Sequence, residues 1–144
     1  MRRVLCVFVA VSGISAAVAA DSKDDLKAMQ GTWRPTSGES AGKAMAGDVL
    51  SKTKLVIKDN KYTVTVGEDP DQGTLKIDAS RMPKTMDIIS TGGANKGRKI
   101  LAIYEIDRDT MKICYDLSGK ARPKDFKTSP GSQLFFATYR LEKE

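Results

Sequence analysis

Two short segments with alternating apolar residues, joined by a polar turn, constrain the fold of this chain more than any other feature. Apolar side chains occupy every second position of residues 100–106 and again of residues 111–115, with Asp107-Arg108-Asp109 between them. A period of two is typical of β-strands with one buried face, and a short polar connection predicts that two such strands form a hairpin. Residues 98–117 are therefore predicted to form the central hairpin of an antiparallel β-protein.

The same alternation on both sides of this hairpin predicts six further strands. Pro35 is expected to end the first strand and Pro83 to lie in a turn, because proline cannot donate a ladder hydrogen bond. Residues 36–48 and 118–132 lack apolar periodicity and contain glycine, so we expect long loops there, and Pro70 indicates a shorter loop at residues 67–72. The further strands are expected at residues 31–34, 53–59, 61–66, 73–78, 86–91 and 133–141.

Eight strands in simple succession indicate an all-β fold, an eight-stranded antiparallel up-and-down barrel with a short N-terminal helix at Ser22–Gln30. Closure into a barrel removes the edge strands that invite aggregation. A barrel of this size can be filled by its own side chains or can hold one small ligand. An open β-sandwich is the alternative architecture.

Residues 1–20 have the pattern of a secretory signal peptide. Arg2 and Arg3 precede an apolar run at residues 4–11, and small residues at 17–20 offer a cleavage site. Residues 21–144 are then the barrel domain, exported to the periplasm or the extracellular space, and contact with a membrane is expected only through the signal segment. An uncleaved amphipathic anchor is the alternative.

Composition excludes several classes of chemistry. The chain contains no histidine and two cysteines, one of which lies in the signal segment. The serine-hydrolase spacing at residues 38–42 therefore lacks its base, and we expect no catalytic residues, cofactor or metal site.

Cys114 is either buried or able to pair with a second chain. The glycines of residues 92–98 are expected to form a hairpin turn, and the acids of residues 68–71 are too few for calcium.

A cluster of basic residues lies in the second long loop, and the chain carries a net charge of +6. This positive charge favours an anionic envelope polymer as a partner. The alternative is that the basic residues only keep the protein soluble. The loop lacks the interleaved aromatic residues of nucleic-acid binders, so no nucleic-acid partner is expected. Nothing in the sequence specifies an oligomeric state. The basic residues are Lys120, Arg122, Lys124 and Lys127.

Several motifs carry a resemblance to a known family. Gly31-Thr32-Trp33 on the first strand and Arg140 on the last look like the lipocalin signature, in which the arginine lies over the tryptophan at the closed end of the barrel. The chain more closely resembles an uncharacterised family of secreted lipocalin-like domains that is abundant in planctomycete bacteria. The matching segments are residues 26–33, 83–87 and 102–114, Arg122-Pro123 with Phe126, and Tyr139-Arg140.

The resemblance implies the barrel and the export but supplies no activity. The leading hypothesis is a non-enzymatic, exported binding protein for a small or apolar ligand, with Tyr62, Tyr104 and Phe136 as interior side chains near the ligand. The alternative is a structural or interaction module of the cell envelope. An enzyme that uses carboxylates alone would need two converging acids with separated pKa values.

Overall fold

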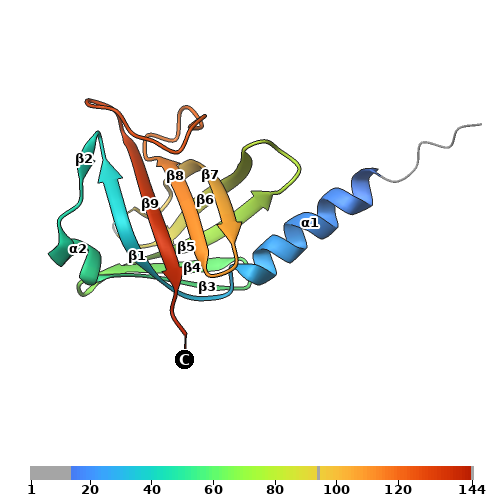
Figure 1. The fold of residues 1–144 in the computed structure, drawn as a ribbon, viewed down its shortest axis with the longest axis horizontal. Helices are drawn as coiled ribbons and strands as arrows, with labels where there is room; N and C mark the ends of the chain where they lie inside the picture. The colour runs from blue at the N-terminus through green and yellow to red at the C-terminus, as the bar shows by residue number, and fades with distance from the viewer. Residues whose placement is uncertain (1–13, 94, 144) are drawn as a thin grey trace, which may run out of the picture.

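An antiparallel β-sheet that closes on itself forms the body of the molecule (Figure 1). The computed structural model describes residues 14–93 and 95–143. Two helices accompany the sheet, α1 (Ile14–Ala28) and α2 (Gly47–Ser51). The strands are β1 (Gly31–Ser40), β2 (Lys43–Ala44), β3 (Thr53–Lys58), β4 (Lys61–Val66), β5 (Asp69–Asp78), β6 (Lys84–Gly92), β7 (Lys99–Asp107), β8 (Thr110–Asp116) and β9 (Leu134–Leu141).

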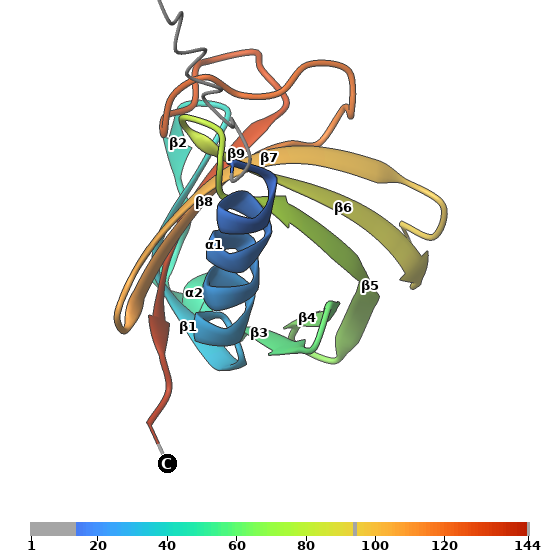
Figure 2. The ribbon, with the colours of Figure 1, turned by 90° about the vertical axis from the view of Figure 1, so that its right-hand side faces the viewer.

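Strand β1 closes the barrel. Each strand from β3 to β9 pairs antiparallel with the next, while β1 pairs with β3 through residues 31–33 and with β9 through residues 33–40. The two-residue strand β2 pairs antiparallel with the last two residues of β1, Glu39 and Ser40. The predicted eight-stranded antiparallel up-and-down barrel is confirmed, and Figure 2 shows its strands arranged in a ring behind α1.

Strand β1 runs past Pro35, where the sequence predicted its end. Its pairing with β3 stops at Trp33, and from Arg34 to Gly38 only β9 accompanies it. The register also shifts between Pro35 and Ser37, as in a β-bulge. A strand with one partner and a bulge tolerates a residue that donates no ladder hydrogen bond. The expected loop at residues 36–48 therefore contains the rest of β1, strand β2 and the start of α2.

Strand β5 begins at Asp69, four residues before the predicted start at Gly73. Pro70 lies opposite Thr65 of β4, and the pairing of β5 with β6 begins only at Gln72. The proline again occupies a stretch with a partner on one side, where its missing N–H is tolerated. The expected loop at residues 67–72 is thus a tight turn followed by strand.

Helix α1 is longer than the predicted Ser22–Gln30. It spans Ile14–Ala28, so the predicted signal-peptide boundary at residue 20 falls within it, and residues 1–13 of that segment lie outside the described residues. Figure 1 shows α1 projecting from the barrel. Within residues 14–93 and 95–143, no helix is long and apolar enough to span a membrane.

Alternate residues of the strands point inward and form one core. At the end of the barrel where α1 meets β1, which we call the closed end, Met29 and Trp33 are completely buried. The indole Nε1 of Trp33 donates a 2.8 Å hydrogen bond to the carbonyl of Met29. The turns β4–β5 and β6–β7 lie at the opposite end, which we call the open end.

The segment of residues 117–133, which we call the outer loop, covers part of the barrel's outer face. Ile103 and Cys114 face outward from neighbouring strands, yet both are buried. The Cys114 Sγ lies 3.6 Å from the carbonyl oxygen of Lys127, and the ring of Phe126 packs 6.1 Å from that of Phe136. Cys114 is therefore a buried free thiol, and the alternative of an exposed thiol that pairs with a second chain is wrong.

Candidate functional site

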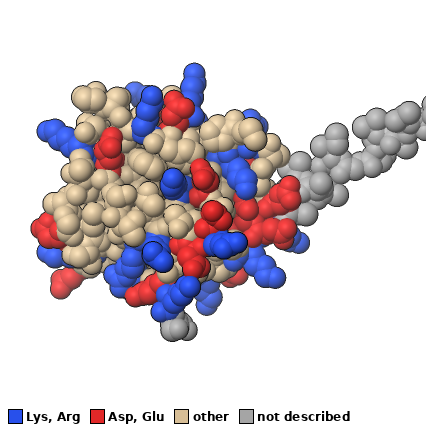
Figure 3. Space-filling model, viewed as in Figure 1, with Lys and Arg blue, Asp and Glu red and all other residues tan. Residues whose placement is uncertain are grey.

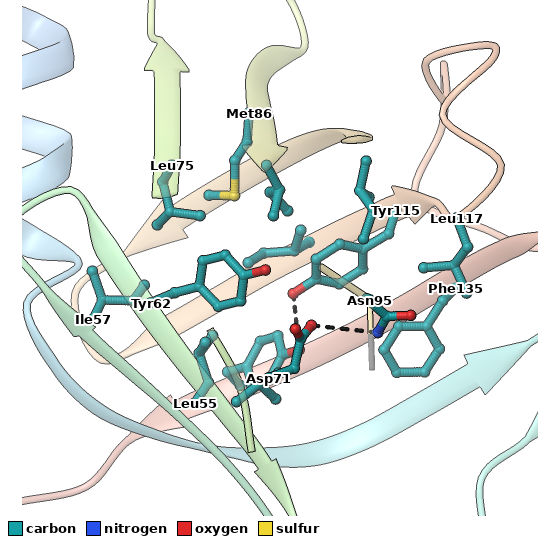
Figure 4. A pocket seen from close by; sticks show the side chains of 15 residues that line it. Leu55, Ile57, Tyr62, Asp71, Leu75, Met86, Asn95, Tyr115, Leu117 and Phe135 are labelled. Carbon is teal, nitrogen blue, oxygen red and sulfur yellow. Dashed lines mark hydrogen bonds between the residues drawn. The ribbon is translucent and has the colours of Figure 1, made fainter. Parts of the chain in front are cut away.

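A cavity of about 170 Å³ lies inside the barrel, and Figure 4 shows the side chains around it. Strands β3 to β9 all contribute to its walls through their inward positions, and the walls are predominantly apolar. Its lining consists of Leu55, Ile57, Tyr62, Val64, Asp71, Leu75, Met86, Ile88, Asn95, Ile100, Ile113, Tyr115, Leu117, Phe135 and Tyr139.

Two polar side chains of the lining, Asp71 and Asn95, lie near the open end of the cavity. Asp71 projects inward from the start of β5, and its Oδ1 accepts a 2.7 Å hydrogen bond from the hydroxyl of Ser90, a buried residue of β6. Its Oδ2 accepts a longer, 3.4 Å bond from the amide Nδ2 of Asn95 in the β6–β7 turn (Figure 4). These two bonds fix the carboxylate at the cavity wall.

The hydroxyl of Tyr62 is buried at this polar end without a hydrogen-bond partner among the described residues. The side chain is 6% exposed and points into the cavity from β4 (Figure 4). Burial, and then the nearby charge of Asp71, raise the pKa of this phenol against a smaller lowering by the Ser90 hydroxyl, so it stays neutral. A buried hydroxyl without a partner costs free energy that a bound molecule could recover.

Two further tyrosines, Tyr115 and Tyr139, lie on the opposite wall. The hydroxyls of Tyr115 and Tyr139 are 2.9 Å apart and hydrogen-bond to each other, which satisfies both groups within the core. Burial raises the pKa of Tyr139 to about 12 and raises that of Tyr115 well above its usual value. Both phenols therefore remain neutral in the folded protein at physiological pH.

The three residues predicted to lie near a ligand have different positions. Tyr62 lines the cavity. Tyr104 is buried inside the barrel but lies at the closed end, where its hydroxyl binds Asp25 of α1. Phe136 lies on the outer face beneath the outer loop, because the inward positions of β9 are Phe135, Ala137 and Tyr139.

Trp33 and Arg140 do not meet as the lipocalin-like pattern implies. Arg140 is exposed and lies opposite Arg34, another exposed residue, in the pairing of β9 with β1. Trp33 is completely buried, so the two side chains face opposite sides of the barrel wall. The contact of Trp33 with Met29 takes the place of the expected contact with the guanidinium.

Asp71, Ser90 and Asn95 were missed as site residues. Asp71 was considered only as one of three acids in a loop, because Pro70 was expected to exclude a strand. With β5 extended to Asp69, the alternation that turns Leu75 inward also turns Asp71 inward. This period of two is the signal that could have found it. In the described part of the chain, no three His, Cys, Asp or Glu side chains are placed to hold a metal ion.

Among the basic residues of the outer loop, Arg122 bonds to the strands of the barrel. Arg122 donates hydrogen bonds to the carbonyls of Met86 and Ala102 and pairs with the carboxylate of Asp87. Lys120, Lys124 and Lys127 are exposed. Figure 3 shows positive and negative side chains interspersed on the visible face of the molecule, without a large surface of one sign.

No family model, curated protein or solved structure matches the chain. The resemblance to planctomycete lipocalin-like domains therefore stays a prediction.

Proposed function

We propose that this protein is an exported, non-enzymatic binding protein that holds one small, largely apolar molecule inside its barrel. The observation that carries the proposal is the cavity of about 170 Å³ with apolar walls and one unsatisfied buried hydroxyl. Ligand sites combine mostly apolar walls with a few placed polar groups, as this cavity does.

The volume limits the size of the ligand. A buried apolar cavity of roughly 150 Å³ binds benzene. A cavity of about 170 Å³ therefore accepts a molecule with one ring or a short branched chain, and larger lipids or pigments would require the open end to widen. The protein is thus proposed to select compact ligands.

Binding is a better proposal than catalysis for this cavity. Its lining has one carboxylate among the described residues, so the pair of acids needed by a carboxylate enzyme does not converge there. Cys114 lies on the outer face of the barrel, away from the cavity. The proposal of export depends on the signal-like pattern of residues 1–20.

Titration with toluene, followed by NMR of the methyl groups, tests the proposal. We expect saturable shifts confined to lining residues such as Leu75, Ile88 and Ile113. Val64→Trp should abolish these shifts, because it places a large ring in the cavity, whereas Thr65→Trp on the opposite face of β4 should retain them. Thermal denaturation would establish that both variants are folded.

Either of two results would overturn the proposal. The first is the absence of saturable shifts in the parent protein with toluene and with other compounds that contain a single benzene ring, and the second is equal toluene affinity in the parent and a folded Val64→Trp variant. Native mass spectrometry of the gently purified protein would add the mass of any ligand that it carries.

A further inference from the structure

The carboxylate of Asp71 holds a charge at the cavity wall with only neutral partners. Its hydrogen bonds come from the Ser90 hydroxyl and the Asn95 amide, and among the described residues no Lys or Arg forms an ion pair with it. A carboxylate has about four lone-pair sites, so Asp71 can accept further hydrogen bonds. A charge beside apolar walls gains most from a partner of opposite sign.

The unsatisfied hydroxyl of Tyr62 and this carboxylate line the same cavity. The charge of Asp71 affects the Tyr62 phenol, and both residues line the cavity from neighbouring strands, β4 and β5. Tyr62 is 6% exposed, so bulk water does not compensate for the missing partner. A donor group on a ligand at this position would reach an acidic oxygen and a phenolic oxygen together.

The approach to the cavity is also acidic. A hollow on the outside of the open end shares Val64, Asp71 and Asn95 with the cavity and adds Asp69 to its lining. Two carboxylates thus flank the approach, although the whole chain carries a net charge of +6. Lys96, the nearest basic residue in sequence to Asn95, is exposed and lines neither space. This distribution attracts cations and repels anions.

We propose that the cavity is selective for compact organic amines in which a benzene-sized apolar body carries a protonated amino group, with the ammonium bound between Asp71 and Tyr62. An ammonium supplies three donors, enough for the two oxygens of this site. A carboxylate ligand would instead place its charge against Asp71. This proposal rests on the proposed function and adds the chemical class of the ligand.

Calorimetric titration of the full chain with four probes of nearly equal size tests the proposal. The probes are toluene, benzyl alcohol, benzylamine and benzoate at neutral pH. We expect benzylamine to bind about tenfold or more tightly than toluene, because the ammonium forms charge-assisted hydrogen bonds that toluene lacks. Benzyl alcohol should bind with intermediate affinity, and benzoate should bind most weakly.

Substitutions at the site separate a direct contact from a general effect of charge. Asp71→Asn keeps the shape of the side chain and should bring the affinity for benzylamine to within about threefold of the affinity for toluene, with both probes measured on the same variant. Asp69→Asn removes one negative charge from the outer hollow alone. This variant should retain most of the difference between its affinities for benzylamine and toluene. Tyr62→Phe should weaken benzylamine binding more than toluene binding.

The outcomes distinguish the two proposals. The amine proposal is wrong, and the binding function stands, if toluene binds and benzylamine binds no more tightly. The same holds if Asp71→Asn leaves the difference between the two affinities intact. If none of the four probes binds, the proposed function itself is wrong. If Asp69→Asn and Asp71→Asn reduce the preference equally, the effect is one of surface charge, and the bound geometry is wrong.

Discussion

The phenol of Tyr104 donates a 2.8 Å hydrogen bond to Oδ2 of Asp25, which joins strand β7 to helix α1 at the closed end of the barrel. The ammonium of Lys84 lies 2.8 Å from the same oxygen, so β6 joins the same cluster. Tyr104 is 1% exposed, and burial, together with its hydrogen bond to Asp25, raises its pKa far above the usual value. One carboxylate of the helix thus satisfies groups on two strands.

Asp25→Ala should lower the free energy of unfolding by roughly 1–3 kcal/mol, because it leaves the buried Tyr104 hydroxyl without its acceptor. Urea denaturation monitored by the fluorescence of Trp33 measures the change. Asp24→Ala is the matched control, since Asp24 is exposed and should shift the free energy by less than about 0.5 kcal/mol. An equal loss in both variants would contradict the assigned contact.

The tyrosines of the folded protein should ionise at a higher pH than those of the unfolded chain. The chain has four tyrosines, and the pKa of each is raised from its usual value by burial. At pH 10 the native protein should therefore show little tyrosinate absorbance, whereas the chain in denaturant should be about half ionised. Substantial ionisation of the native protein at this pH would contradict the packing described for Tyr62 and Tyr104.

The same shifts predict a loss of stability in alkali. A phenol whose folded pKa is raised contributes stability that is fully present below the unfolded pKa of about 10 and is lost as pH rises toward the folded value. For Tyr139 that folded value is about 12. The contribution of the tyrosines to the free energy of unfolding should be constant from pH 7 to 9 and should fall above pH 10. Tyr139→Phe should reduce this decrease.

Gly73 provides space for the ring of Tyr62. A Cβ at this position would lie 2.0 Å from the carbonyl oxygen of Ile89 and 2.8 Å from Cε1 of Tyr62. Gly73→Ala should therefore destabilise the fold by roughly 1–3 kcal/mol through overpacking and should shift the NMR signals of the cavity. Gly47→Ala is the control, because a Cβ there meets nothing within 4 Å and should leave stability nearly unchanged.

Arg122 fastens the outer loop to the barrel. Arg122→Ala removes its bonds to the carbonyls of Met86 and Ala102 and leaves Asp87 without its cation. The loop should then open more often, and Cys114, which is completely buried beneath it, should react faster with a thiol reagent. Mass spectrometry of the peptide that contains Cys114 measures the labelling rate.

Two comparisons make the labelling experiment specific. Lys124→Ala changes an exposed residue of the same loop and should leave the rate unchanged. Burial raises the pKa of the Cys114 thiol, so the native protein should label slowly at pH 7. Rapid labelling of the parent chain, or equal rates in the parent and Arg122→Ala, would contradict the role assigned to the loop.

The barrel could be predicted from the sequence because its strands alternate in polarity and short turns connect most of them. The errors occurred where proline interrupts that alternation. Pro35 and Pro70 each lie where their strand has a partner on one side only, and this pairing depends on segments far away in the chain. A local pattern contains no information about it.

The candidate site could be predicted only in part. Tyr62 follows from its inward position, but Tyr104 is held at the closed end by Asp25, a contact across 79 positions of sequence. Phe136 was expected inside the barrel, but the inward positions of β9 are Phe135, Ala137 and Tyr139. Cys114 and Phe136 show the limit of alternation, because the outer loop buries residues on the face that should meet solvent.

The pairing of Trp33 with Leu141 places the first and last strands of the barrel side by side at the closed end. The backbone N–H of Glu142 also donates a 2.8 Å bond to the carbonyl of Thr32. The polypeptide thus enters and leaves the barrel at the same place, away from Asp71 and the open end. A purification tag, a fused reporter or a solid support attached after strand β9 would leave the mouth of the cavity facing free solution.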